Sequence, residues 1–197
     1  MARPREFELE QVAEGLLNTF WLRGYAGTSI ADLTAATNLL PGSLYAAFGN
    51  KEAMFLVAVD RYASLMRTKL SSDARGLEGV RTLLDTIVRL TANDPERRGC
   101  LIINAIPETA SFSKDTRRHV QRGLRALHRF VRKQFLDAQE DSELTETCDI
   151  EALAAVVFSA VVGIRVLGRA GHTRRELQAV ADGAMLVTRQ RFQKEKS

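Results

Sequence analysis

The sequence has little proline, few aromatic residues and few residues that bind metals. Four prolines among 197 residues leave few helix breakers, whereas the helix formers alanine, leucine, arginine and glutamate are abundant. The two cysteines, Cys100 and Cys148, cannot form a disulfide framework and show no CxxC spacing. The three histidines, His119, His128 and His172, lie far apart and lack the spacing of a zinc site. The composition therefore predicts an all-helical chain with reduced cysteines, no metal site and no cofactor.

The sequence also lacks features that would indicate a membrane protein or an enzyme. No apolar run approaches the roughly 20 residues that cross a bilayer, and the N-terminal segment MARPREFELE is charged where a signal peptide would be apolar. No glycine-rich phosphate loop, nucleophile elbow or HExxH motif is present. We expect a soluble, cytoplasmic protein that is not an enzyme.

The chain is basic, but its charge is unevenly distributed. The formal net charge is +4, with 28 lysines and arginines against 24 acidic residues. Residues 1–70 contain seven basic and seven acidic residues, so the excess lies in the C-terminal part. Nucleic-acid binding by the N-terminal part would therefore depend on where individual charges are placed.

Breaks in the helical pattern divide the chain into an N-terminal domain, residues 1–50, and a larger domain, residues 51–197. Apolar residues recur every three or four positions in three short helices of the first domain. A long fourth helix begins after Asn50 and leads into the second domain, whose last two helices are expected at about 150–169 and 173–192. The pattern predicts an all-helical head joined by a long helix to a helical body.

The second and third helices are separated by a tight turn. Thr28 and Ser29 provide hydroxyl caps for the second helix, and Asp32 follows three residues after Ser29, as in a capping box. Asn38 tolerates left-handed geometry, and Pro41 suits the first position of a third helix over residues 41–48. Two short helices with such a turn are typical of the helix-turn-helix motif, whose second helix enters the major groove.

The first third of the chain contains the motifs Gly24-Tyr25, Thr28-Ser29, Gly42-x-Leu44-Tyr45-x-x-Phe48 and Lys51-Glu52. With these motifs it resembles the DNA-binding domain of the TetR family of transcriptional regulators. The resemblance implies a ligand-responsive regulator, most often a repressor, that binds a palindromic double-stranded DNA operator as a homodimer. A small apolar or aromatic inducer would release it. Two alternatives stay open: the body responds to a protein partner or to cysteine modification, or the chain is a helical protein with no DNA function.

The second and third helices supply the expected contacts to DNA. The hydroxyl and amide groups at Thr28 and Ser29 suit a phosphate at a helix N-terminus. Gly42 has no side chain, so the third helix can approach the duplex closely, and Ser43 is the expected base contact.

Four flanking residues are expected to anchor the head on the DNA backbone or in a groove. Tyr45 and Lys51 are predicted phosphate anchors, and Arg3 and Arg5 form a short basic arm for an adjacent minor groove. The alternatives are a half-buried core ring for Tyr45, a solvated helix start for Lys51, and an unstructured charged tail for the two arginines.

The third helix departs from the family pattern at three positions. Leu40 occupies the position before the helix where a hydroxyl cap is usual, which by itself would cost about 1 kcal/mol. Ala46 and Ala47 stand where polar or aromatic contacts are common, leaving direct readout mainly to Ser43 and to methyl groups against thymine. We expect little base-edge hydrogen bonding and a larger share for DNA shape.

The resemblance implies that the body both dimerises and binds an inducer. The last two helices have more apolar surface than one small body needs, which suggests a four-helix interface across a two-fold axis. Its predicted residues are Leu153, Val157, Ala160, Val161, Ile164, Leu167, Leu177, Val180, Ala184 and Val187. The alternative is that these side chains form the core of the monomer.

Apolar and polar side chains of the body could form an inducer pocket. The predicted lining residues are Cys100, Asn104, Glu108, Phe112, Leu124, His128 and Phe158. Cys100 follows two arginines at an expected helix start, a setting that can make a thiol reactive. The stretch RRGCLIINAIPETA also resembles one in a TetR subgroup in which a cysteine near this place can act as a sensor. A buried structural cysteine is the alternative.

Overall fold

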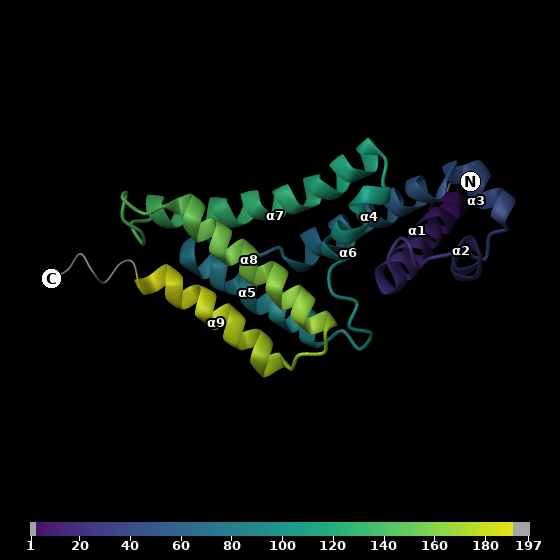
Figure 1. Cartoon of the computed structure of the whole chain (residues 1–197). Coiled ribbons are helices and arrows are strands. Elements are labelled where there is room, and N and C mark those ends of the chain that lie inside the picture. The colour runs from purple at the N-terminus through teal and green to yellow at the C-terminus, as the bar shows by residue number, and fades with distance from the viewer. Residues whose placement is uncertain (1–2, 191–197) are drawn as a thin grey trace. The chain divides into compact units, whose positions relative to one another are not determined.

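The computed structural model describes residues 3–190, with side chains from residue 9 to residue 188. Every regular element in this part of the chain is helical, as the sequence predicts (Figure 1). The elements are α1 (Arg3–Arg23), α2 (Ile30–Thr37), α3 (Pro41–Phe48), α4 (Lys51–Lys69), α5 (Gly76–Ala92), α6 (Leu101–Asn104), the 3-10 helix η1 (Ile106–Ser111), α7 (Lys114–Glu140), α8 (Ile150–Arg169) and α9 (Arg174–Gln190).

The chain forms two compact units that are not continuous in sequence. Residues 1–68 and 100–123 form the first unit, and residues 69–99 and 124–197 form the second. Segment 100–123, which contains α6, η1 and the start of α7, therefore packs with the N-terminal helices. The boundary predicted at residue 50 separates a DNA-binding head from a ligand-binding and dimerising body, whereas the two units are defined by packing. The predicted boundary therefore stays a prediction.

The first unit is built around α1, α2, α3 and the start of α4. α1 contacts α2, and α2 contacts α3. Each helix has a fully buried apolar side chain: Leu16 in α1, Leu33 in α2, Leu44 in α3 and Phe55 in α4. Burial of these side chains fixes the orientation of α3, because Leu44 is its one buried residue.

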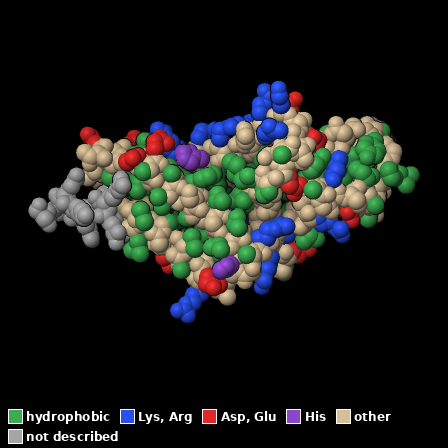
Figure 2. All heavy atoms as spheres, viewed as in Figure 1, with side chains coloured by type: hydrophobic (Ala, Val, Ile, Leu, Met, Phe, Trp, Pro, Cys, Tyr) green, Lys and Arg blue, Asp and Glu red, His purple; other side chains and the backbone are tan. Residues whose placement is uncertain are grey.

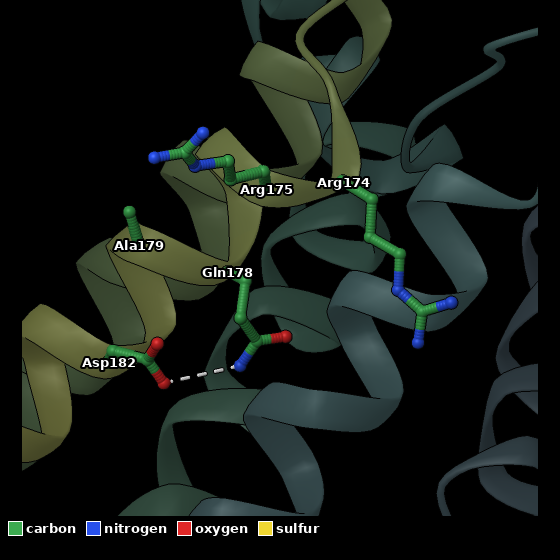
Figure 3. Close-up of a pocket in the computed structure, with 5 residues that line it drawn as sticks. All are labelled: Arg174, Arg175, Gln178, Ala179 and Asp182. Atoms are coloured by element: carbon green, nitrogen blue, oxygen red, sulfur yellow. Dashed lines mark hydrogen bonds between the residues drawn. The ribbon is translucent and has the colours of Figure 1, made fainter.

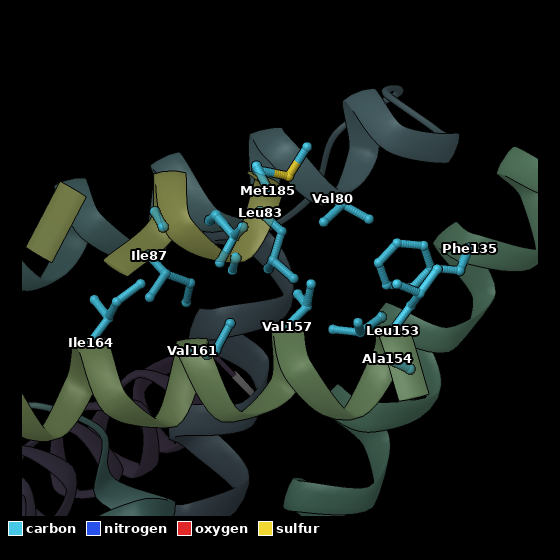
Figure 4. Close-up of a cluster of buried hydrophobic side chains, with 14 of the residues drawn as sticks. Val80, Leu83, Ile87, Phe135, Leu153, Ala154, Val157, Val161, Ile164 and Met185 are labelled. Atoms are coloured by element: carbon cyan, nitrogen blue, oxygen red, sulfur yellow. The ribbon is translucent and has the colours of Figure 1, made fainter. Parts of the chain in front are cut away.

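The core of the second unit lies between α5, α8 and α9, with the later part of α7. Figure 4 shows Leu153, Val157, Val161 and Ile164 on one side of α8, pointing toward side chains of α5 and α9. All four are at most 2% exposed. This side of α8 therefore belongs to the core of the chain itself.

The predicted dimer interface is wrong for most of its residues. Leu153, Val157, Val161, Ile164, Leu177 and Ala184 are buried within the monomer, as the alternative proposed. Ala160, Leu167 and Val180 are partly buried against the same core, and Val187 is 44% exposed. The sequence pattern failed here because α8 is apolar on more than one side.

The length and composition of α8 also contradict the expectation that no apolar segment is long enough to cross a membrane. α8 has 20 residues, and its mean hydropathy over an 18-residue window is 2.1. Its packing in the second unit gives a different reason for the apolar composition, since one side of α8 contacts both α5 and α9.

Candidate nucleic-acid interface

The N-terminus of α2 has the predicted capping box. Ser29 Oγ accepts a hydrogen bond from the backbone N–H of Asp32 at 3.1 Å, and Asp32 Oδ2 accepts one from the backbone N–H of Ser29 at 2.8 Å. Hydrogen bonds from the Ser29 hydroxyl and backbone lower the pKa of Asp32, and the positive charge of Arg23 lowers it further. Ser29 is exposed, but a phosphate at this helix end would compete with the carboxylate of Asp32.

The predicted phosphate contact from the Thr28 hydroxyl is wrong. Thr28 is 1% exposed, and its hydroxyl donates a hydrogen bond to the carbonyl oxygen of Gly24 at 2.6 Å. Its backbone N–H donates to the carbonyl oxygen of Tyr25 at 3.3 Å. Thr28 therefore closes the turn after α1 instead of facing the solvent.

The turn before α3 has the predicted geometry. Asn38 is left-handed, with φ 55° and ψ 23°, and Pro41 occupies the first turn of α3. Leu40 is the N-cap residue, with φ −68° and ψ 153°, and no side chain caps the helix. The expected absence of a hydroxyl cap is therefore confirmed.

α3 exposes nearly all of its side chains to solvent. Leu44 is buried, whereas Gly42, Ser43, Tyr45, Ala46 and Ala47 are exposed. A Cβ atom at Gly42 would meet nothing within 4 Å, so no packing inside the chain requires glycine there. Tyr45 is 45% exposed, so part of its ring can be reached from the solvent, and its role as a phosphate anchor stays a prediction. This exposed surface is available to a groove of DNA.

Lys51 begins α4 next to an aromatic ring. Its ammonium nitrogen lies 4.5 Å from the centroid of the Tyr25 ring, a cation–π contact. Burial lowers the pKa of Lys51, while the carboxylates of Glu108 and Asp32 oppose that shift. Lys51 is therefore held in place rather than fully solvated. The side chains of Arg3 and Arg5, the predicted arm, lie outside the described residues.

Residues 106–116, here called the clamp, are distant from the head in sequence but contact it in the structure. Glu108 Oε2 accepts a hydrogen bond from the backbone N–H of Ala26 at 2.6 Å, across 82 residues of sequence. The Phe112 ring packs edge-on against Tyr25, with centroids 4.9 Å apart, and stacks on Phe55 at 5.4 Å. The clamp thus contacts the turn between α1 and α2 and also contacts α4.

A second polar contact joins the clamp to the start of α4. The carboxylate of Glu52 accepts hydrogen bonds from the Thr116 hydroxyl and from the backbone N–H of Ser113 at 3.2 Å. Burial raises the pKa of Glu52, but the hydrogen bonds from Thr116 and Ser113 outweigh it, so the pKa lies below its ordinary value. Sequence reasoning missed this contact, because no local pattern pairs residues 64 positions apart.

The predicted pocket residues are divided between the two units. Cys100, Asn104, Glu108 and Phe112 belong to the first unit, whereas Leu124, His128 and Phe158 belong to the second. Glu108 and Phe112 contact Ala26, Tyr25 and Phe55 of the head. Within the second unit the rings of His128 and Phe158 pack edge-to-face with centroids 5.5 Å apart.

Among the described residues, the surface of the second unit has open hollows, of which two involve α9. The larger, about 540 Å³, is lined by Arg174, Arg175, Gln178, Ala179 and Asp182 of α9 (Figure 3). The other, about 460 Å³, lies between α5 and α9, and shares Arg174 and Gln178 with the first. None of the predicted pocket residues lines either hollow.

Two parts of the chain match known protein families. Residues 14–58 match a family described as bacterial regulatory proteins, tetR family. Residues 76–184 match one described as tetracyclin repressor-like, C-terminal domain. The chain belongs to the TetR family. It is a DNA-binding transcriptional regulator, and the family consists of such regulators rather than enzymes.

Named relatives of this TetR-family chain include a repressor. The HTH-type transcriptional repressor ComR of Escherichia coli (strain K12) is 27% identical over 185 residues, which cover 91% of this chain and 88% of ComR. The uncharacterized HTH-type transcriptional regulator YezE of Bacillus subtilis (strain 168) is 28% identical over 194 residues, covering 95% of this chain and 99% of YezE.

Solved structures of the family share the fold along most of the chain. A cysteine mutant of the TetR family regulator CifR, complexed with 26bp double-strand operator DNA, has a TM-score of 0.78 and 30% identity. The match covers 89% of this chain and 94% of that one. A TetR regulator from Chloroflexus aurantiacus J-10-FL has a TM-score of 0.81 and 25% identity, covering 96% and 98% of the two chains.

Proposed function

We propose that this protein is a cytoplasmic, homodimeric repressor that binds a palindromic DNA operator and is released by a small apolar or aromatic inducer. The observation that carries the proposal is α3, which is fixed by one buried leucine and exposes most of its surface next to Lys51, a lysine held by a cation–π contact. The CifR structure, with 30% identity, contains operator DNA. The DNA contacts we propose are Arg3, Arg5, Ser29, Gly42, Ser43, Tyr45 and Lys51.

Selection of bound sites from random duplexes, followed by gel shifts with the full-length protein, tests operator binding. With three cationic groups engaged on each half-site, a dimer neutralises about six phosphates, and log K against log[salt] should have a slope near −5. A protein that binds no selected duplex, or a slope near zero, would contradict the proposal.

We place the dimer interface on the outward side of α8 and α9. Val156 and Val166 of α8 are 37% and 50% exposed, and Leu186 and Val187 of α9 are 57% and 44% exposed. Val156 and Val166 recur at helical spacing with Gly163, where an added Cβ would meet nothing within 4 Å. The neighbouring helices α8 and α9 therefore each carry apolar side chains that the monomer leaves uncovered, and we propose that a second copy of the chain covers them.

A charge on this surface should produce monomers. In Val166→Glu the carboxylate would be buried in a dimer interface without a partner, so we expect a monomer in analytical ultracentrifugation at micromolar concentration. Leu136→Glu is the matched control, because Leu136 of α7 is 38% exposed and lies outside the proposed interface. A dimeric Val166→Glu variant would exclude this surface as the dimer interface.

Inducer release would act through the clamp. The clamp contacts both the turn before α2 and the start of α4, so a displacement of residues 106–116 would remove support from both. An effector must favour the released state by about 5.5 kcal/mol to shift the population from 1:99 to 99:1. Titration of small apolar and aromatic compounds into the operator complex tests this response.

The alternative is a response to cysteine modification or to a protein partner. Cys100 is a free, half-buried thiol that precedes α6, on the segment that leads into the clamp. Operator binding is measured with and without a thiol-specific oxidant for the wild type and for Cys100→Ser, with Cys148→Ser as the control. Loss of oxidant sensitivity only in Cys100→Ser would favour this alternative over a small-molecule inducer.

A further inference from the structure

We infer that Leu40 is a specificity-determining residue, which contacts the methyl group of a thymine in the major groove of the operator. The inference rests on the proposed operator binding and specifies what α3 recognises there. It follows from the absence of charge on the recognition element, the exposure of Leu40, and its position at the N-terminus of α3.

The recognition element carries no charged side chain. From Asn38 to Asn50 the sequence contains no lysine, arginine, histidine, aspartate or glutamate. On α3 itself, hydrogen bonds to base edges can come from the side chains of Ser43 and Tyr45. Figure 2 shows hydrophobic side chains gathered over the end of the head where α3 lies. This surface is poorly suited to bidentate readout of guanine or adenine.

Leu40 is the most exposed large hydrophobic side chain that the structure describes. Its exposed fraction is 75%, compared with 45% for Tyr45 on the same element. The side chain also makes no cap for α3, whose N-terminus has no side-chain hydrogen bond. A serine at this position would remove exposed apolar surface and would also cap the helix. Folding therefore gives no reason for a leucine here.

Leu40 lies at a position from which its side chain can contact a base in the major groove. In a helix-turn-helix protein the N-terminal residues of the recognition helix contact base edges. The thymine C5-methyl is the apolar group that a base pair presents in the major groove, and apolar side chains recognise it. Two residues further on, Gly42 leaves open space around the backbone, so no side chain there keeps the duplex away from Leu40.

The test compares thymine with deoxyuridine in the selected operator. Replacement of one thymine by deoxyuridine removes the methyl group and leaves base pairing intact. For the wild type we expect about a 4-fold loss of affinity per buried methyl group, which becomes about 15-fold when both half-sites are changed. The loss should occur at one thymine position in each half-site and should be small at the others.

Two variants assign this effect to Leu40. Leu40→Ala should bind the unmodified operator more weakly and should no longer distinguish thymine from deoxyuridine at that position. Leu40→Ser should behave in the same way on DNA while its melting temperature rises, because serine caps α3. A misfolded variant would instead melt earlier. Leu9→Ala is the control, since Leu9 is 62% exposed on α1 and should leave the thymine preference unchanged.

The outcomes separate this inference from the proposed function. If the wild type binds the selected operator equally well with deoxyuridine at every thymine, the inference is wrong and operator binding stands. If Leu40→Ala keeps the full thymine preference, Leu40 faces some other partner and the inference is also wrong. If the wild type binds no selected duplex, the proposed function itself fails.

Discussion

The clamp should contribute measurably to the stability of the head through the ring of Phe112. Phe112 is 4% exposed and packs against two rings, with centroid distances of 4.9 Å to Tyr25 and 5.4 Å to Phe55. Phe112→Leu keeps most of the apolar volume but removes both ring pairs. Each such pair contributes about 0.5–1.5 kcal/mol beyond its buried area, so we expect a loss of about 1–3 kcal/mol in the free energy of unfolding.

Urea unfolding at a fixed protein concentration measures this loss as a lower midpoint with an unchanged slope. Operator affinity should fall as well, because the Tyr25 ring that Phe112 supports also contacts Lys51. Phe130→Leu is the matched control: Phe130 of α7 is 38% exposed, and its change should stay within about 0.5 kcal/mol. Equal midpoints for the two variants would refute the view that the clamp stabilises the head.

Three further predictions concern a buried hydroxyl, a close helix contact and the capping box. Thr116→Val removes a hydrogen bond to Glu52 and should lower the free energy of unfolding by about 1–2 kcal/mol at pH 7. The pKa of Glu52 in the folded protein lies below its ordinary value of 4.5. The stabilisation is therefore present above pH 4.5 and is lost as the pH falls through the pKa of the folded state. A gap between wild type and variant that stays constant from pH 7 to pH 3 in urea titrations would contradict the role of the ionised carboxylate. Gly168→Ala places a Cβ 2.0 Å from Cγ2 of Thr91. This overpacking should lower the free energy of unfolding by about 1–3 kcal/mol, measured by calorimetry. An unchanged free energy of unfolding would show that α8 can move away from Thr91. Asp32→Asn should lower the melting temperature at neutral pH but not in acid, because the wild-type carboxyl is itself protonated in acid. An equal fall in melting temperature at both pH values would exclude a role for the charge of Asp32.

The sequence by itself determined the local structure of the head. Ser29 with Asp32, Asn38 and Pro41 act through hydrogen bonds and backbone preferences within a few residues, so their effects are visible in the sequence. The same local signals predicted the missing cap at Leu40. Together with the family motifs, they identified a helix-turn-helix regulator.

Tertiary structure decided which polar groups are free. Thr28 stands at a helix start that suits a phosphate, but in the folded head its hydroxyl is buried and donates to Gly24. Glu108 was predicted to hold a ligand, and instead it accepts a hydrogen bond from Ala26. The sequence cannot predict this pairing, because it depends on how the chain returns to the head after 82 residues.

Tertiary structure also decided which side of α8 faces inward. Leu153 and Val157 are buried against α5 and α9, whereas Val156 and Val166 are left exposed. The sequence alone could not distinguish these two sides, because both are apolar and helical periodicity shows only that a side is apolar, not what covers it. Only the packing of α5 and α9 selects the side that forms the core, and that choice leaves Val156 and Val166 on the other side uncovered.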